Sequence, residues 1–184
     1  MNATDLKKGR IFQEKGVPFK VEKYEHIKVA RGSANVKVKA RNLINGNVIQ
    51  KGYLSTDKVE DADVITKTAQ FLYKSGNNYV FMDPTNYEQV SIPRKVIGEG
   101  AKFIGKSLEV RVLYFEGSPI SVELPKTVVF EVEYTEPAQR GNTVSNAFKD
   151  AKLVNGTIVK VPMFIKIGDK VKINTDSGEY VSRE

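Results

Sequence analysis

Side chains that could perform catalysis are few in this chain of 184 residues. There is no cysteine, which excludes disulfides, thiolate nucleophiles and thiolate zinc sites. A catalytic triad or a metal centre generally needs imidazole groups, and His26 is the single histidine. We interpret it as a surface residue at the end of a strand. We interpret a cluster of carboxylates, Glu131, Glu133 and Glu136, as a solvated strand face rather than an acid/base pair. We therefore expect no catalytic residue, no metal site, no cofactor and no enzymatic activity.

One stretch matches a nucleotide-binding motif. Residues 100–107, GAKFIGKS, fit G-x-x-x-x-G-K-[ST], in which a strand leads into a glycine-rich loop and a helix starts at the lysine. Here the order is reversed, because the alternating strand pattern SLEVRVLYF follows the motif. No alternation of strands and helices predicts the parallel sheet that such a loop needs. We interpret the motif as a glycine-bounded turn between a short helix and a strand.

The most informative stretch is cationic and lies near the N-terminus. No carboxylate occurs between Glu25 and Asp57. That interval holds six cations: Lys28, Arg31, Lys37, Lys39, Arg41 and Lys51. The formal net charge of the chain is +7, so we expect an anionic partner, either a nucleic acid or an acidic membrane surface.

Three of these cations alternate with apolar residues. Lys37, Lys39 and Arg41 should form a row on the outer face of a strand, with steps of about 6.6 Å, comparable to the phosphate spacing of a nucleic acid strand. Residues 29–34, VARGSA, are small and should form a tip that projects into solvent with Arg31 at its apex. A solvated basic face without a partner is the alternative. The long interval without acids favours binding of an RNA or DNA backbone.

The elements that position these residues are mostly strands. Apolar and polar residues alternate with a period of two around residues 36–41 and 130–134, as in half-buried strands. Turn signals separate the apolar runs at Gly16, Asn45-Gly46, residues 75–78, Glu116-Gly117, Asn155-Gly156 and Ser177-Gly178. A helical turn or two is predicted near residues 93–103 and near residues 61–64. Short strands with tight turns predict an all-β fold of small barrels.

We place domain boundaries after Asp63, which ends an acidic stretch, and after Thr127. These boundaries predict three domains, residues 1–63, 64–127 and 128–184, each of about 60 residues and near the lower size at which a domain folds alone. The N-terminal sequence MNATDLKKGR lacks the apolar run of a secretory signal, and no window approaches about 18 apolar residues. We therefore expect a cytoplasmic protein without a membrane-spanning helix. Of the two anionic partners, we expect the nucleic acid and no membrane.

Aromatic residues in the central third leave another function open. Tyr73, Tyr79, Phe81 and Tyr87 could stack on bases, as in a generic RNA-binding module built on an OB-fold. Packing in the core and between domains is the interpretation that we favour for them.

Several longer stretches carry a family resemblance. They are KKG near the start, H-x-K-x-x-[KR]-G-x-A followed by V-K-x-R-N-L, FLYKSGNNYVFMDPTNYEQ, the ELP that ends at Pro125, and TEPAQRGNT leading to VPMFIKIGDKVKINTDSGEYVSR. In these stretches the chain resembles bacterial elongation factor P over essentially its whole length. The resemblance implies an N-terminal KOW/SH3-like barrel followed by two OB-folds in an L shape like that of a tRNA. It also implies a monomeric translation elongation factor that binds the 70S ribosome between the P and E sites and relieves stalling at consecutive prolines.

The resemblance implies roles for the hairpin tip. The family's tip residue reaches toward the CCA end of the P-site peptidyl-tRNA and corresponds here to Arg31, with Lys28, Ala30 and Gly32 beside it. The basic strand that follows would contact the RNA backbone, in transfer or ribosomal RNA.

A loop in the third domain also matches the family. The loop that approaches the small subunit and messenger RNA corresponds to Gly141, Asn142 and Thr143. Most members carry Asp where this chain has Asn142, so the contact lacks a charge here.

The tip departs from the family's commonest sequence, Pro-Gly-Lys-Gly, and reads Val-Ala-Arg-Gly over residues 29–32. Arg31 cannot accept the lysylation found in lysine-bearing members. A subset of members with arginine is rhamnosylated, and we expect the same modification of Arg31 by an arginine rhamnosyltransferase. The alternative is the elongation-factor-P-like paralogue, which works with an unmodified arginine.

Overall fold

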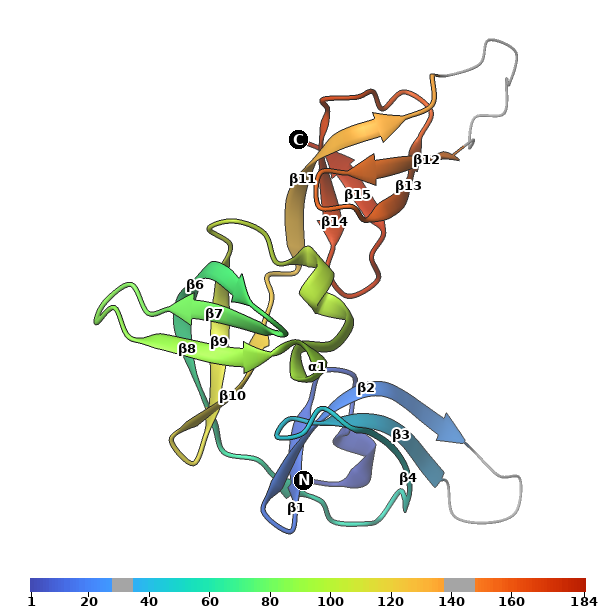
Figure 1. Cartoon of the computed structure of the whole chain (residues 1–184). Coiled ribbons are helices and arrows are strands. Elements are labelled where there is room, and N and C mark those ends of the chain that lie inside the picture. The colour runs from blue at the N-terminus through green and yellow to red at the C-terminus, as the bar shows by residue number, and fades with distance from the viewer. Residues whose placement is uncertain (28–34, 138–147) are drawn as a thin grey trace. The chain divides into compact units, whose positions relative to one another are not determined.

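The computed structural model describes residues 1–27, 35–137 and 148–184, and strands dominate it (Figure 1). The described strands form three five-stranded sheets, with the orders β4-β3-β2-β1-β5, β10-β9-β6-β7-β8 and β13-β12-β11-β14-β15. The predicted all-β fold class is therefore confirmed.

The first sheet follows a short 3-10 helix, η1 (Ala3–Asp5). Its strands are β1 (Ile11–Glu14), β2 (Val17–Ile27), β3 (Asn35–Asn42), β4 (Val48–Leu54) and β5 (Glu60–Asp61). The alternation predicted for residues 36–41 is confirmed on β3, where Val36, Val38 and Ala40 are at most 2% exposed and join the core of this sheet. The helical turn predicted near residues 61–64 is wrong. That segment holds the end of β5 and the start of β6, because β5 pairs with β1 and this long-range pairing overrides local propensity.

Along the chain, the strands of the second sheet are interrupted by the longest helical stretch among the described residues. Its strands are β6 (Val64–Ser75), β7 (Asn78–Met82), β8 (Gln89–Pro93), β9 (Glu109–Phe115) and β10 (Ser118–Glu123). Helix α1 (Arg94–Ile97) and the 3-10 helix η2 (Gly98–Phe103) lie between β8 and β9, as predicted near residues 93–103. The motif GAKFIGKS therefore leads from a short helix into a strand, which confirms its interpretation as a turn.

The four aromatic residues of the central third divide into two pairs. Tyr79 and Phe81 are buried, so the prediction that they are core residues is confirmed. Tyr73 and Tyr87 are 51% and 71% exposed, and for them the prediction of packing is wrong. Their exposure follows from position, because Tyr73 lies near the end of β6 and Tyr87 lies in the loop between β7 and β8.

The third sheet contains the predicted solvated carboxylates. Its strands are β11 (Thr127–Thr135), β12 (Phe148–Leu153), β13 (Ile158–Pro162), β14 (Lys170–Asn174) and β15 (Tyr180–Arg183). Glu131 and Glu133 are exposed on β11, and Glu133 forms an ion pair of 2.8 Å with Lys152. These contacts confirm a solvated face.

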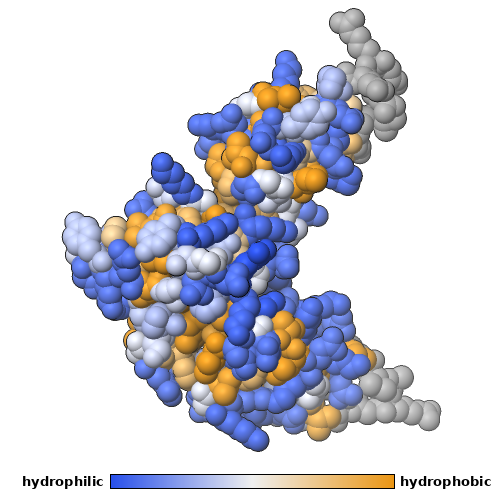
Figure 2. Space-filling model, viewed as in Figure 1, coloured by the Kyte–Doolittle hydropathy of each residue, from blue (hydrophilic) through white to orange (hydrophobic). Residues whose placement is uncertain are grey.

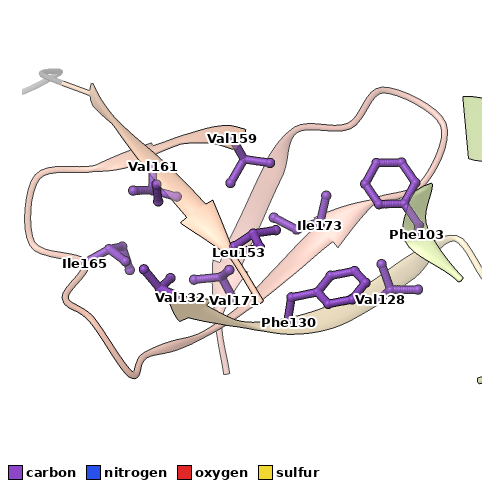
Figure 3. Packing of buried hydrophobic residues seen from close by; sticks show 11 residues of the cluster. Phe103, Val128, Phe130, Val132, Leu153, Val159, Val161, Ile165, Val171 and Ile173 are labelled. Carbon is purple, nitrogen blue, oxygen red and sulfur yellow. The ribbon is translucent and has the colours of Figure 1, made fainter. Parts of the chain in front are cut away.

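The chain divides into two compact units that differ from the three sheets. One unit comprises Met1–Gly98 and Val110–Glu123, and the other comprises Glu99–Glu109 and Leu124–Glu184. Phe103 is only 2% exposed and belongs to the core of the second unit, where Figure 3 shows it at one end of a cluster of aliphatic side chains and Phe130. Residues 99–109 thus pack with the C-terminal strands. The three domain ranges predicted from the sequence stay a prediction.

The turns lie where the sequence places them. Lys15-Gly16 and Glu116-Gly117 connect adjacent strands, with φ values of 50° and 74° in the first pair and 48° and 77° in the second. Positive φ at both central residues is the conformation that matches the twist of two-residue hairpins.

Across the described part of the chain, no helix has the length and apolar character needed to cross a lipid bilayer.

Candidate nucleic-acid interface

The hairpin of β2 and β3 displays lysines on its outer face. In the antiparallel register, Lys39 lies opposite Lys23 and Lys37 lies opposite Glu25. The inward residues of β3 are buried, so these side chains are fixed on the solvent side of a rigid sheet. The row predicted on this strand is therefore real for Lys37 and Lys39.

A groove with a volume of about 320 Å³ crosses β2, β3 and the neighbouring strand β4. Its lining comes from β2, β3 and β4: Lys23, Glu25, Lys37, Val38, Lys39, Gln50, Lys51 and Gly52. On β4, Gln50 lies opposite Lys39 and Gly52 lies opposite Lys37. A Cβ atom added at Gly52 would meet nothing within 4 Å, so the missing side chain leaves free space beside Lys37.

The charges in the groove are only partly neutralised. Lys23 and Glu25 form an ion pair of 2.6 Å. Their hydrogen bond lowers the pKa of Glu25 and raises the pKa of Lys23. Neither Lys37 nor Lys39 forms an ion pair with a carboxylate of residues 1–27, 35–137 or 148–184. Lys37 lies opposite Glu25 and interacts with its charge at longer range. The groove therefore keeps an excess of positive charge that is available to an anionic ligand.

Lys51, the fourth lysine that lines the groove, is paired with a carboxylate. Lys51 contacts Glu14 of β1, and the Tyr53 hydroxyl donates a hydrogen bond of 2.6 Å to Glu14. Burial raises the pKa of Glu14, but the hydrogen bonds from Lys51 and Tyr53 outweigh it and hold the pKa below its usual value. Burial and the neighbouring Glu14 raise the pKa of Tyr53. This network ties β4 to β1 and leaves Lys51 with a compensated charge.

The predicted role of Arg41 needs correction. Its Nε donates to Glu22 at 2.7 Å, and its Nη1 donates to the backbone carbonyls of Gly46 at 3.0 Å and Lys95 at 2.9 Å. The side chain is 17% exposed. A guanidinium with these partners is used inside the protein, because binding a phosphate would leave the carboxylate and both carbonyls without their donor. The basic row therefore shortens to Lys37 and Lys39.

Arg41 instead fastens the turn at residues 45–46 to the start of the central helical stretch. Gly46 has a φ of 77°, and a Cβ atom there would come within 2.8 Å of the Lys95 carbonyl oxygen. An added Cβ at Gly98 would come within 3.1 Å of the Arg41 side chain. Both glycines are therefore needed for the close approach that the arginine bridges.

Other predicted site residues cannot be placed. Seven of them lie outside the described residues: Lys28, Ala30, Arg31, Gly32, Gly141, Asn142 and Thr143. His26 is exposed near the end of β2, with its Nε2 3.4 Å from the Ser55 hydroxyl oxygen, as expected of a strand-end residue. Within the described ranges, no three His, Asp or Glu side chains gather in a way that could hold a metal ion.

Sequence reasoning missed three residues of the groove, Lys23, Gln50 and Gly52. The hairpin register carries the signal for all three. Once Val38 and Ala40 are assigned to the core, pairing outward from the tip and from the turn at residues 45–46 places each of them beside Lys37 or Lys39.

The visible surface in Figure 2 is largely hydrophilic, with apolar residues in scattered groups. Fold and site together define a modular β-sheet protein whose first sheet offers a cationic groove, a form suited to a polyanionic ligand.

Comparison with known proteins identifies the family. Three family models match consecutive segments: Elongation factor P (EF-P) KOW-like domain over residues 2–59, Elongation factor P (EF-P) OB domain over residues 64–122, and Elongation factor P, C-terminal, over residues 128–183. Elongation factor P of Oleidesulfovibrio alaskensis is 41% identical over 183 residues, which cover 100% of this chain and 99% of that protein. Elongation factor P of Aquifex aeolicus is 40% identical and covers 97% of this chain and 93% of its own length. The chain belongs to the elongation factor P family of translation elongation factors.

The match confirms the resemblance and the predicted KOW-like and OB domains. Among solved structures, eukaryotic translation initiation factor 5A from Methanococcus jannaschii is 22% identical, with a TM-score of 0.44 over 68% of this chain and 92% of that chain. A likeness of this size adds nothing to the assignment.

Proposed function

We propose that this chain binds the ribosome between the P and E sites and stimulates peptide-bond formation at consecutive prolines by positioning peptidyl-tRNA. Membership of the elongation factor P family over the whole chain is the observation that carries the proposal. The hairpin supports it, because Ile27 at the end of β2 pairs with Asn35 at the start of β3. Arg31 therefore belongs to the connection between two paired strand ends of a rigid sheet.

Positioning is sufficient for this activity, since the ribosome supplies the chemistry. Proline has a fixed φ, and a peptidyl-tRNA that ends in proline rarely reaches the geometry of attack. Orientation of two reactants can lower a barrier by up to about 7–11 kcal/mol in favourable cases. The guanidinium of Arg31 keeps its proton near neutral pH, so it cannot act as a general base. Its planar donors suit phosphates and RNA bases.

The tip is tested by a synthesis assay. Arg31→Ala should abolish rescue of a reporter that contains consecutive prolines, while the unfolding midpoint stays that of the parent. Arg31→Lys, which keeps a charge but loses the planar donors, should rescue weakly. Rescue by Arg31→Ala at the level of the parent would show that the tip is not the active element.

Lys37 and Lys39 are proposed to contact the RNA backbone beside the tip. Each phosphate contact adds about 0.7–0.9 to the slope of log affinity against log salt, so Lys37→Gln with Lys39→Gln should reduce the slope of ribosome binding by about 1.4–1.8. Lys106→Gln with Lys126→Gln removes the same charge from exposed positions outside the groove. An equal effect of both pairs would attribute the change to net charge and refute a local contact.

Arg31 is proposed to carry a rhamnose added by an arginine rhamnosyltransferase. The intact mass of protein purified from its native host tests this directly, because a deoxyhexose adds a distinct increment at one residue. An unmodified mass in a factor that is fully active would favour the alternative, a tip that works as plain arginine.

In the C-terminal domain, we propose that Gly141, Asn142 and Thr143 approach the small subunit and messenger RNA. Asn142→Asp restores the charge common in the family and should leave proline rescue intact. A loss of rescue in this variant would show that the neutral amide is required here.

A further inference from the structure

We infer that the groove that crosses β2, β3 and β4 is a binding site for one segment of an RNA sugar–phosphate backbone. The missing side chain of Gly52 leaves the space that this segment occupies, and we call this space the backbone site. This inference rests on the proposed function, because it assigns a shape to the interface that Lys37 and Lys39 form. Gly52 lines the groove, and nothing fills the position of its missing side chain.

Glycine is an unfavourable choice at this position for stability alone. Gly52 lies inside β4, an edge strand of the first sheet, and its φ lies outside the positive range that favours glycine. Glycine inside a strand weakens it, and it often marks a place where a ligand or another backbone approaches closely. Chain neighbours aside, no atom of residues 1–27, 35–137 or 148–184 makes that close approach at Gly52. The space beside Lys37 is therefore available to a ligand.

The charge pattern around the space points to an anionic ligand. Lys39 lies directly opposite Lys23, and like charges in this arrangement destabilise a sheet. Glu25 neutralises Lys23 through their ion pair, whereas the neutral Gln50 is the other neighbour of Lys39. The positive charge of Lys39 is thus left facing the groove.

The spacing of the two lysines and their charge, rather than the size of the groove, favour a backbone over a compact ligand. The groove, of about 320 Å³, lies at the lower end of the range of small-molecule pockets, about 300–1,000 Å³. Lys37 and Lys39 stand two residues apart, a step of about 6.6 Å along the strand that matches successive phosphates. An extended phosphodiester chain can therefore contact both lysines while its sugar occupies the space above Gly52.

A series of substitutions at Gly52 that leave the net charge unchanged tests the backbone site. Gly52→Ala, Gly52→Val and Gly52→Leu fill the groove step by step, and the added side chains favour the extended strand. Binding to ribosomes with tRNA in the P site, and to deacylated tRNA at low salt, should weaken with increasing side-chain size. The leucine variant should lose about tenfold, the equivalent of one charged hydrogen bond. The unfolding midpoint should stay equal or rise. Ser118→Val, at an exposed position of the edge strand β10, is the matched control and should change neither measurement.

The outcomes separate this inference from the proposed function. Parent-like binding by Gly52→Leu, together with weakened binding by the Lys37→Gln and Lys39→Gln pair, would overturn the backbone site at Gly52. The proposed contact of the two lysines with RNA would then still stand. Parent-like binding by both would overturn both. Weaker binding to ribosomes with unchanged binding to tRNA would identify the bound backbone as ribosomal RNA and overturn tRNA as the ligand of the groove. A loss of binding affinity that follows a falling unfolding midpoint, instead of side-chain size, would overturn the backbone site as well.

Discussion

Replacing Arg41 by methionine should destabilise the unit that contains it. Methionine keeps much of the apolar stem but removes the hydrogen bonds to Glu22, Gly46 and Lys95. We assign about 1 kcal/mol to each of the two lost bonds to backbone carbonyls. The lost ion pair adds about 1 kcal/mol, because Glu22 is 31% exposed and can be hydrated once it is unpaired.

The sum is about 3 kcal/mol, which lowers the unfolding midpoint of a unit of this size by about 10 °C. Thermal unfolding followed by circular dichroism measures it. Lys39→Met is the matched control, since it removes an exposed cation from the same strand and should shift the midpoint by less than about 2 °C. Arg41→Lys should give an intermediate loss, because an ammonium cannot reproduce the planar set of donors. If Arg41→Met has the same unfolding midpoint as the control, the contacts of Arg41 contribute no net stability. The structural role assigned to its hydrogen bonds is then wrong.

Three further predictions concern the cores and the responses of stability to acid and to alkali. Phe103→Ala should destabilise the second unit by about 3–5 kcal/mol, because it leaves a cavity among buried side chains, whereas Phe164→Ala, at a residue that is 58% exposed, should cost little; chemical denaturation of both variants measures the difference. The lowered pKa of Glu14 means that its stabilising contribution is present above its usual pKa of 4.5 and is lost as the pH falls, so Glu14→Gln should show a smaller loss of stability than the parent under acid. The raised pKa of Tyr53 gives the opposite sign, with stability present below its usual pKa of 10.0 and lost at higher pH, and Tyr53→Phe should remove that alkaline loss.

Strand positions and turns could be predicted because they depend on local patterns. The alternation around Val36 and Val38 specifies which face of β3 enters the core, and Asn-Gly and Glu-Gly pairs specify where hairpins turn. The helical turn predicted near residues 61–64 is wrong because the structure of this segment depends on pairing with a strand about 50 residues earlier. Local propensity carries no information about such a partner.

The proposed RNA-binding surface shows the same division. Periodicity placed Lys37, Lys39 and Arg41 on one face, but it could not say which of them already has a partner in the protein. Glu22 lies 19 residues before Arg41, and the Lys95 carbonyl lies 54 residues after it. The helical pattern of residues 93–103 likewise predicted an element but not that Phe103 packs with the C-terminal strands.

The most direct test of the central claim is the rate of single-turnover peptide-bond formation between two prolines on the ribosome, at saturating concentrations of the factor. The account predicts that the parent accelerates this step, and that it leaves a pair of good substrates, such as two phenylalanines, unchanged. It also predicts that Arg31→Ala binds the ribosome but gives the rate measured without the factor. Acceleration of the proline step by Arg31→Ala to the level of the parent would contradict the claim that this chain works by positioning peptidyl-tRNA through its arginine tip.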